Sequence, residues 1–110
     1  MEEKRWTFGH FDYTANAEEI KSCAPKGWGK IIDKILDVLP EDVRVAQVKE
    51  KFGSLRFYSY GASEEIDDLI IEAERESSVT CELCGEPAVT DWDRGWVKTL
   101  CEKCKSDSNQ

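Results

Sequence analysis

Apolar residues recur at helical spacing in one stretch of the first half of the chain. Between Lys26 and Leu39 they fall at i, i+3, i+4, i+7, i+8 and i+11, so they share one face of an amphipathic helix. These residues are Trp28, Ile31, Ile32, Ile35, Leu36 and Leu39. Pro40 lacks a backbone N–H and should end the helix. The pattern therefore predicts a helix of about three turns with one buried face.

The next segment has the composition of β-strands. Residues 43–51 and 55–60 are rich in β-branched and aromatic side chains, and residues 52–54 between them include a glycine suited to a tight turn. Alternation along the second strand directs Leu55 and Phe57 to one face of the sheet. We therefore predict an antiparallel hairpin with one face buried.

A second helix should begin at Ser63, whose hydroxyl can cap the helix N-terminus. Carboxylates just inside that end suit its positive dipole: Glu64, Glu65, Asp67 and Asp68. Its buried face would consist of Ile66, Leu69, Ile70 and Ala73. By contrast, the apolar residues among positions 1–22 show no clear periodicity. Residues 16–20 could start a short helix.

Four of the five cysteines form two Cys-x-x-Cys pairs, Cys81 with Cys84 and Cys101 with Cys104. Two such pairs offer four thiolates to a tetrahedral Zn²⁺, and the segment between them would fold back as a hairpin that turns at residues 93–95. Gly85 lies where such a knuckle commonly needs a positive φ. The alternative, free or disulfide-bonded thiols, explains this spacing less well. Four thiolates leave no open position at the metal, so one structural zinc is expected.

These elements predict an α+β fold. The amphipathic helix, the β-hairpin and the second helix would pack together in a body at residues 1–80, in which residues 1–22 are unassigned. A four-cysteine zinc ribbon at residues 81–104 and a frayed tail at residues 105–110 would follow. Val79 and Thr80 lead directly into the first cysteine pair, so the ribbon should be rigidly coupled to the body.

Charge and targeting signals narrow the functional classes. The chain has 15 basic and 23 acidic residues, a net charge of −8, which disfavours general attraction to nucleic acid and favours a protein partner with a basic surface. No apolar run is long enough for a membrane span, and the N-terminus lacks a signal-peptide core, so we expect a cytoplasmic protein. Reduced thiols in that compartment favour metal binding over disulfides.

No catalytic constellation stands out, so we expect the protein not to be an enzyme. His10 has no recognisable Ser or Cys partner pattern and is interpreted as an ordinary surface or capping residue. Cys23 is expected to be a buried small hydrophobe.

Three groups of residues are candidates for partner binding, each with a simpler interpretation. The predicted hairpin carries Lys49, Lys51, Arg56 and Tyr58, which could contact phosphates and stack on bases, although a half-buried strand explains the same composition. Trp92 and Trp96 could anchor a partner or pack on the metal knuckles. The acidic residues Glu64, Glu65, Asp67 and Asp68 could act as a nucleic-acid decoy or form a solvated helix face.

Several motifs resemble a family of small uncharacterised proteins of bacteriophages and bacterial genomes. They are Gly27-Trp28, the segment at residues 47–58, the Cys-x-x-Cys-Gly knuckle at residues 81–85 and the segment at residues 95–101. The resemblance implies a phage or prophage origin but no activity. The cysteine segment alone is similar to the zinc finger of DksA/TraR-type transcription regulators, but their long coiled coil has no counterpart here.

Taken together, the sequence predicts a non-enzymatic, phage-encoded interaction protein. It would bind a host machine that handles nucleic acid or serves defence, and the most concrete form of this hypothesis is that it inhibits that machine. A phage machine is an alternative partner. The alternative function is a nucleic-acid-binding zinc-ribbon regulator that uses the hairpin at residues 49–60.

Overall fold

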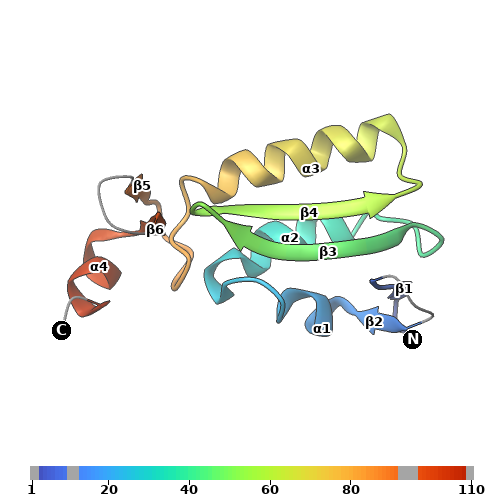
Figure 1. Ribbon diagram of the computed structural model, residues 1–110, viewed down its shortest axis with the longest axis horizontal. Coiled ribbons are helices and arrows are strands. Elements are labelled where there is room, and N and C mark those ends of the chain that lie inside the picture. Colours follow the sequence, from blue (N-terminus) through green and yellow to red (C-terminus); the bar gives the residue numbers. More distant parts are fainter. Residues whose placement is uncertain (1–2, 10–12, 92–96, 109–110) are drawn as a thin grey trace.

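The computed structural model describes residues 3–9, 13–91 and 97–108 (Figure 1). Its elements are strands β1 (Arg5–Thr7) and β2 (Thr14–Asn16), helix α1 (Ala17–Lys21), the 3₁₀ turn η1 (Lys26–Trp28), helix α2 (Gly29–Leu36), strands β3 (Arg44–Lys51) and β4 (Ser54–Tyr60), helix α3 (Glu64–Ser77), strands β5 (Val89–Asp91) and β6 (Lys98–Leu100), and helix α4 (Glu102–Ser108). Within the described ranges the strands form three antiparallel two-stranded sheets, each made of sequence neighbours, and a single parallel bridge joins Val45 of β3 to Phe8. The predicted α+β class is confirmed.

The β3–β4 hairpin is the central sheet of the molecule. Phe52 and Gly53 form its two-residue turn with φ values of 53° and 79°, the positive pair that a type I′ turn requires. This turn pairs Lys51 with Ser54 and thereby sets the register as far as Gln47 and Tyr58; between Val45 and Gln47 the register shifts at a β-bulge. Leu55 and Phe57 are buried, as the alternation predicted.

The amphipathic helix differs from its expected form. Residues 26–28 form the η1 turn, and α2 ends at Leu36 instead of continuing to Pro40. After Leu36 the helix ends in a tighter turn of the 3₁₀ type, in which the N–H of Val38 donates to the carbonyl of Ile35, three residues earlier, at 3.2 Å. The predicted helix is therefore shorter at both ends, yet all six of its apolar residues are buried in the core.

Helix α3 lies along the free edge of β4 (Figure 1). Two of its side chains accept hydrogen bonds from outward-facing backbone N–H groups of β4: Ser77 Oγ from Leu55 at 2.7 Å and Glu74 Oε2 from Phe57 at 3.0 Å. These bonds protect an edge that could otherwise pair with another strand. The predicted cap is confirmed, because the N–H of Ile66 donates to Ser63 Oγ.

The N-terminal segment contains a small hairpin that its sequence pattern did not predict. Strands β1 and β2 pair, and Asn16 and Glu19 then form a reciprocal capping box at the start of α1. Trp6 of β1 is only 1% exposed, and its indole N–H donates to the carbonyl of Leu39 at 3.1 Å. Trp6 thus anchors the hairpin to the core.

The chain continues as helix α4 past Lys105, where the sequence predicted a frayed tail. None of the helices within the described ranges is both long enough and apolar enough to cross a membrane.

Candidate metal centre

The structure brings together the four cysteines that the sequence singled out. The Sγ atoms of Cys81, Cys84, Cys101 and Cys104 all lie within 4.8 Å of one another, and those of Cys84 and Cys101 are 3.5 Å apart. A tetrahedral ion with bonds of about 2.3 Å to sulfur would need sulfur atoms about 3.8 Å apart. The cluster therefore has the size and the thiol donor set for one ion such as zinc.

Two different local structures present the thiols. The first pair lies in a turn in which the N–H of Gly85 donates to the carbonyl of Cys81 at 3.1 Å. Gly85 has a φ of 85°, so the expected left-handed conformation is confirmed. Cys101 is the single residue between β6 and α4, and Cys104 lies in the first turn of α4. The β5–β6 pairing brings these two structures together.

Hydrogen bonds within the cluster shift the ionisation of its thiols. Burial alone would raise the pKa of Cys81, but backbone N–H groups of Cys101, Cys84 and Leu83 directed at its sulfur outweigh burial and lower the pKa to about 6. The pKa of Cys104 is raised, chiefly by its side-chain hydrogen bond with Cys101. One thiolate thus forms readily, whereas a complete set of four would need the positive charge of a metal.

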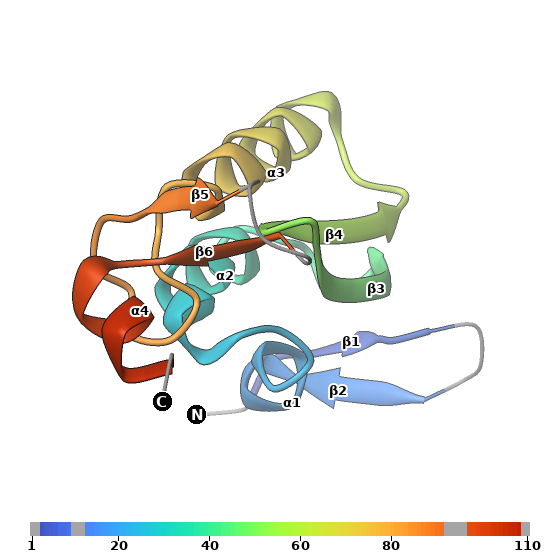
Figure 2. The ribbon, with the colours of Figure 1, turned by 60° about the vertical axis from the view of Figure 1, so that its left-hand side comes forward.

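We call the segment from Cys81 to Ser108 the cysteine lobe; Figure 2 shows its elements β5, β6 and α4 on one side of the body. Residues of η1 bond to the start of this lobe and to the residue just before it. The N–H of Gly27 donates to the carbonyl of Glu82 at 2.7 Å, and the indole N–H of Trp28 donates to the carbonyl of Thr80 at 2.9 Å. Gly27 approaches so closely that a Cβ atom there would lie 2.7 Å from the carbonyl carbon of Glu82. The absence of a side chain at Gly27 makes this contact feasible.

Two threonines of the cysteine lobe join it to the body on a second side. Thr99 Oγ1 donates to the carbonyl of Gly53 in the β3–β4 turn at 2.6 Å. Thr90 Oγ1 donates to the carbonyl of Ser78 just after α3 at 2.7 Å. The lobe is therefore bonded both to the hairpin turn and to the chain at the end of α3. None of these contacts has a recognisable sequence signal, because each joins groups distant along the chain.

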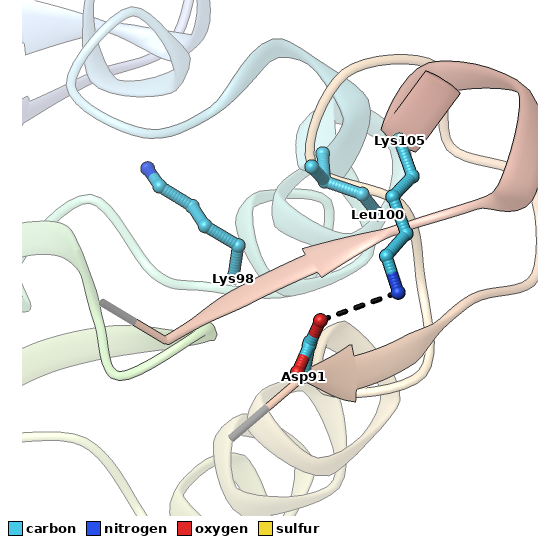
Figure 3. A pocket seen from close by; sticks show the side chains of 4 residues that line it. All are labelled: Asp91, Lys98, Leu100 and Lys105. Atoms are coloured by element: carbon cyan, nitrogen blue, oxygen red, sulfur yellow. Dashed lines mark ion pairs between the residues drawn. The ribbon is translucent and has the colours of Figure 1, made fainter. Parts of the chain in front are cut away.

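Helix α4 is held against β5 by an ion pair (Figure 3). Lys105 Nζ lies 3.2 Å from Asp91 Oδ2, and Leu100 lies beside the pair. The hollow between these side chains measures about 10 Å³, no more than a single water needs. The ion pair links β5 to the helix that carries Cys104.

The predicted partner-binding residues that the structure describes lie on α3 and on the β3–β4 hairpin, and none of them belongs to the cysteine cluster. Glu64, Glu65, Asp67 and Asp68 are all exposed on α3. Lys49, Lys51, Arg56 and Tyr58 lie on β3 and β4, where Lys51 and Tyr58 are exposed and the other two half-buried. Trp92, Trp96 and the turn at residues 93–95 lie outside the described residues, as does His10.

The expectation that Cys23 is buried is wrong. It is exposed just after α1, and its Sγ lies 3.7 Å from the carbonyl oxygen of Glu19. The short α1 ends at Lys21, so Cys23 falls on the outside of the turn that follows.

No protein-family model, curated protein or solved structure matches the chain. Its function is therefore inferred from the chemistry of the cysteine cluster and of the surface.

Proposed function

We propose that this chain is a non-enzymatic interaction protein, of phage origin, whose four cysteines hold one structural Zn²⁺. The observation that carries the proposal is the closed cluster of four thiols. Four sulfur ligands satisfy a tetrahedral zinc and leave no position for water or substrate. The metal's work is then to hold the cysteine lobe in place.

The composition of the lobe supports a structural metal. Its buried residues among those described are Cys81, Glu82 and Thr99, of which two are polar. So small an apolar interior cannot offset the entropy lost on ordering the segment. Zinc binding, on the order of 10 kcal/mol, supplies the missing stabilisation.

The partner we propose is a host machine that handles nucleic acid or serves defence and presents a basic surface, which this protein inhibits. The support is the exposed carboxylates of α3, which include Glu65, Asp68 and Glu72. Ser77 and Glu74 fix this helix to β4, so it presents the charges on a rigid support. A fixed row of carboxylates can compete with phosphates for a basic channel.

The metal is tested by native mass spectrometry of the purified full chain. One zinc per chain, lost in the variant Cys81→Ser, is the expected result. An exposed-cysteine variant, Cys23→Ser, is the matched control and should retain the metal. A protein that binds no metal, or that still binds zinc after Cys81→Ser, would contradict the structural site.

The partner is tested by affinity capture from bacterial lysate at low and high salt. We expect a captured protein that is released by salt and lost when Asp68→Asn is combined with Glu72→Gln, both beyond the first turn of α3. The control pair Asp37→Asn and Asp42→Asn removes the same charge from exposed positions elsewhere and should retain the partner. Equal loss in both pairs would show that net charge alone, and not α3, governs binding.

A further inference from the structure

The outer face of the β3–β4 hairpin, opposite the core, is defined by the strand register. Gln47 pairs with Tyr58, Lys49 with Arg56, and Lys51 with Ser54, and all six side chains share this face with Tyr60. None of these seven positions is acidic. We call this set of residues the hairpin face.

The cations of the hairpin face are not neutralised within the described part of the chain. No ion pair there joins Lys49, Lys51 or Arg56 to a carboxylate. Glu50 of β3 belongs to the opposite face, and its Oε2 accepts a hydrogen bond from the N–H of Gly53 at 2.8 Å. In a chain with more acidic than basic residues, this face is a local region of positive charge.

Two tyrosine rings lie beside these cations. Tyr58 is 44% exposed and Tyr60 is 60% exposed, whereas Leu55 and Phe57 of the same strand are buried in the core. Being two residues apart on one strand, they are separated by about 6.6 Å. At that spacing, neighbouring bases of an unpaired strand can each stack on one ring.

We infer that the hairpin face binds single-stranded nucleic acid, with phosphates at Lys49, Lys51 and Arg56 and bases on Tyr58 and Tyr60. A duplex would use only the cations, because its bases are already stacked on one another. The net charge of −8 opposes the approach of any polyanion, so binding is weak. The salt dependence comes from the three cations, whose phosphate contacts at about 0.7 each give a salt slope of about 2. This surface differs from the acidic face of α3, so the inference goes beyond the proposed function.

The test is fluorescence anisotropy of the zinc-loaded full chain with labelled single-stranded oligonucleotides, RNA and DNA, and with a duplex of the same length. The variant Lys49→Gln/Arg56→Gln should weaken single-strand binding about tenfold and reduce the salt slope by about 1.4, since each lost phosphate contact contributes about 0.7. The control Lys26→Gln/Lys30→Gln removes the same charge from exposed lysines elsewhere and should bind like the unmodified protein.

A second variant separates stacking from charge. Tyr58→Ser leaves the net charge unchanged and should weaken single-strand binding about fivefold or more, with the salt slope preserved. Thermal unfolding of each variant checks that the hairpin still folds. Absence of binding at low salt, equal binding of duplex and single strand, or equal losses in the hairpin and control pairs would each overturn the inference. The lysate capture described above gives a further check. If the variant Lys49→Gln/Arg56→Gln fails to capture a protein that the α3 variants still capture, the hairpin face binds a protein instead of nucleic acid.

Discussion

The contact between Gly27 and the cysteine lobe yields a sharp prediction for the substitution Gly27→Ala. A Cβ atom at Gly27 would overlap the carbonyl oxygen of Cys81 and lie 2.7 Å from both the carbonyl carbon and the oxygen of Glu82. These are backbone atoms, which cannot swing aside as a flexible side chain would. The lobe must therefore shift away from η1.

The shift would also lengthen the hydrogen bond from the N–H of Gly27 to the carbonyl of Glu82, which measures 2.7 Å. Overpacking at a closely packed contact costs about 1–3 kcal/mol, and a lost hydrogen bond at such a contact costs about 1–3 kcal/mol. We expect Gly27→Ala to lower the free energy of unfolding by about 2–6 kcal/mol. The lobe should also release its metal to a chelator faster, because it loses its close backbone contact with Gly27.

Urea unfolding of the metal-loaded protein measures the first effect, and the rate of metal transfer to a coloured chelator measures the second. Gly29→Ala is the matched control, because the nearest atom to its Cβ would be Lys21 Cδ at 3.9 Å. Gly29 has a helical φ of −55°, so alanine there should leave stability unchanged or raise it by up to about 1 kcal/mol. Gly27→Ala with normal stability and normal metal release, or equal damage from both substitutions, would refute the role of Gly27.

Three further perturbations test other parts of the structure. Removing the metal should abolish the order of the cysteine lobe while the body keeps its helices, which circular dichroism and amide exchange would show; a lobe still protected without metal would contradict this. Ser77→Ala should cost about 1–3 kcal/mol in urea unfolding and speed amide exchange at Leu55, whose buried N–H loses its acceptor; unchanged exchange would contradict it. Hydrogen bonds from the backbone N–H of Asn16 and the hydroxyl of Tyr13 lower the pKa of Glu19, so its stabilisation is present above its unfolded pKa and is lost as pH falls through the lowered value. The difference in free energy of unfolding between the unmodified protein and Glu19→Gln should therefore shrink as pH falls over that range. An NMR titration in which the Glu19 carboxyl group has an ordinary midpoint would contradict this.

Local patterns determined much of this protein. Helical spacing located the six apolar residues that α2 and its flanking turns bury, because a helix face repeats every few residues. Strand alternation assigned Leu55 and Phe57 to the core, and the tight turn between the strands required a glycine. The spacing of the two cysteine pairs likewise identified the cluster. Each Cys-x-x-Cys pair places two thiols close together, so two pairs supply the four ligands of a tetrahedral ion.

The N-terminal hairpin was missed because its strands are only three residues long, too short for a periodic signal. Trp6 is fixed by a hydrogen bond to Leu39, a partner distant in the chain that no local pattern specifies. The prediction that Cys23 is buried was wrong, and the cause is related. Burial of an isolated residue depends on what packs over it, and residue type alone does not determine that.

The sequence by itself therefore determined the helices and strands with regular periodicity, the fold class and the identity of the four clustered cysteines. Only the tertiary structure decided how the lobe meets the body, through the bare backbone of Gly27 and the hydroxyls of Thr90 and Thr99. Alternation along β4 places Arg56 on the same face as Tyr58 and Tyr60, but only the register of the two strands showed that Lys49 and Lys51 join them there. Periodicity reports which face of an element is buried, whereas contacts between elements depend on their relative placement in space.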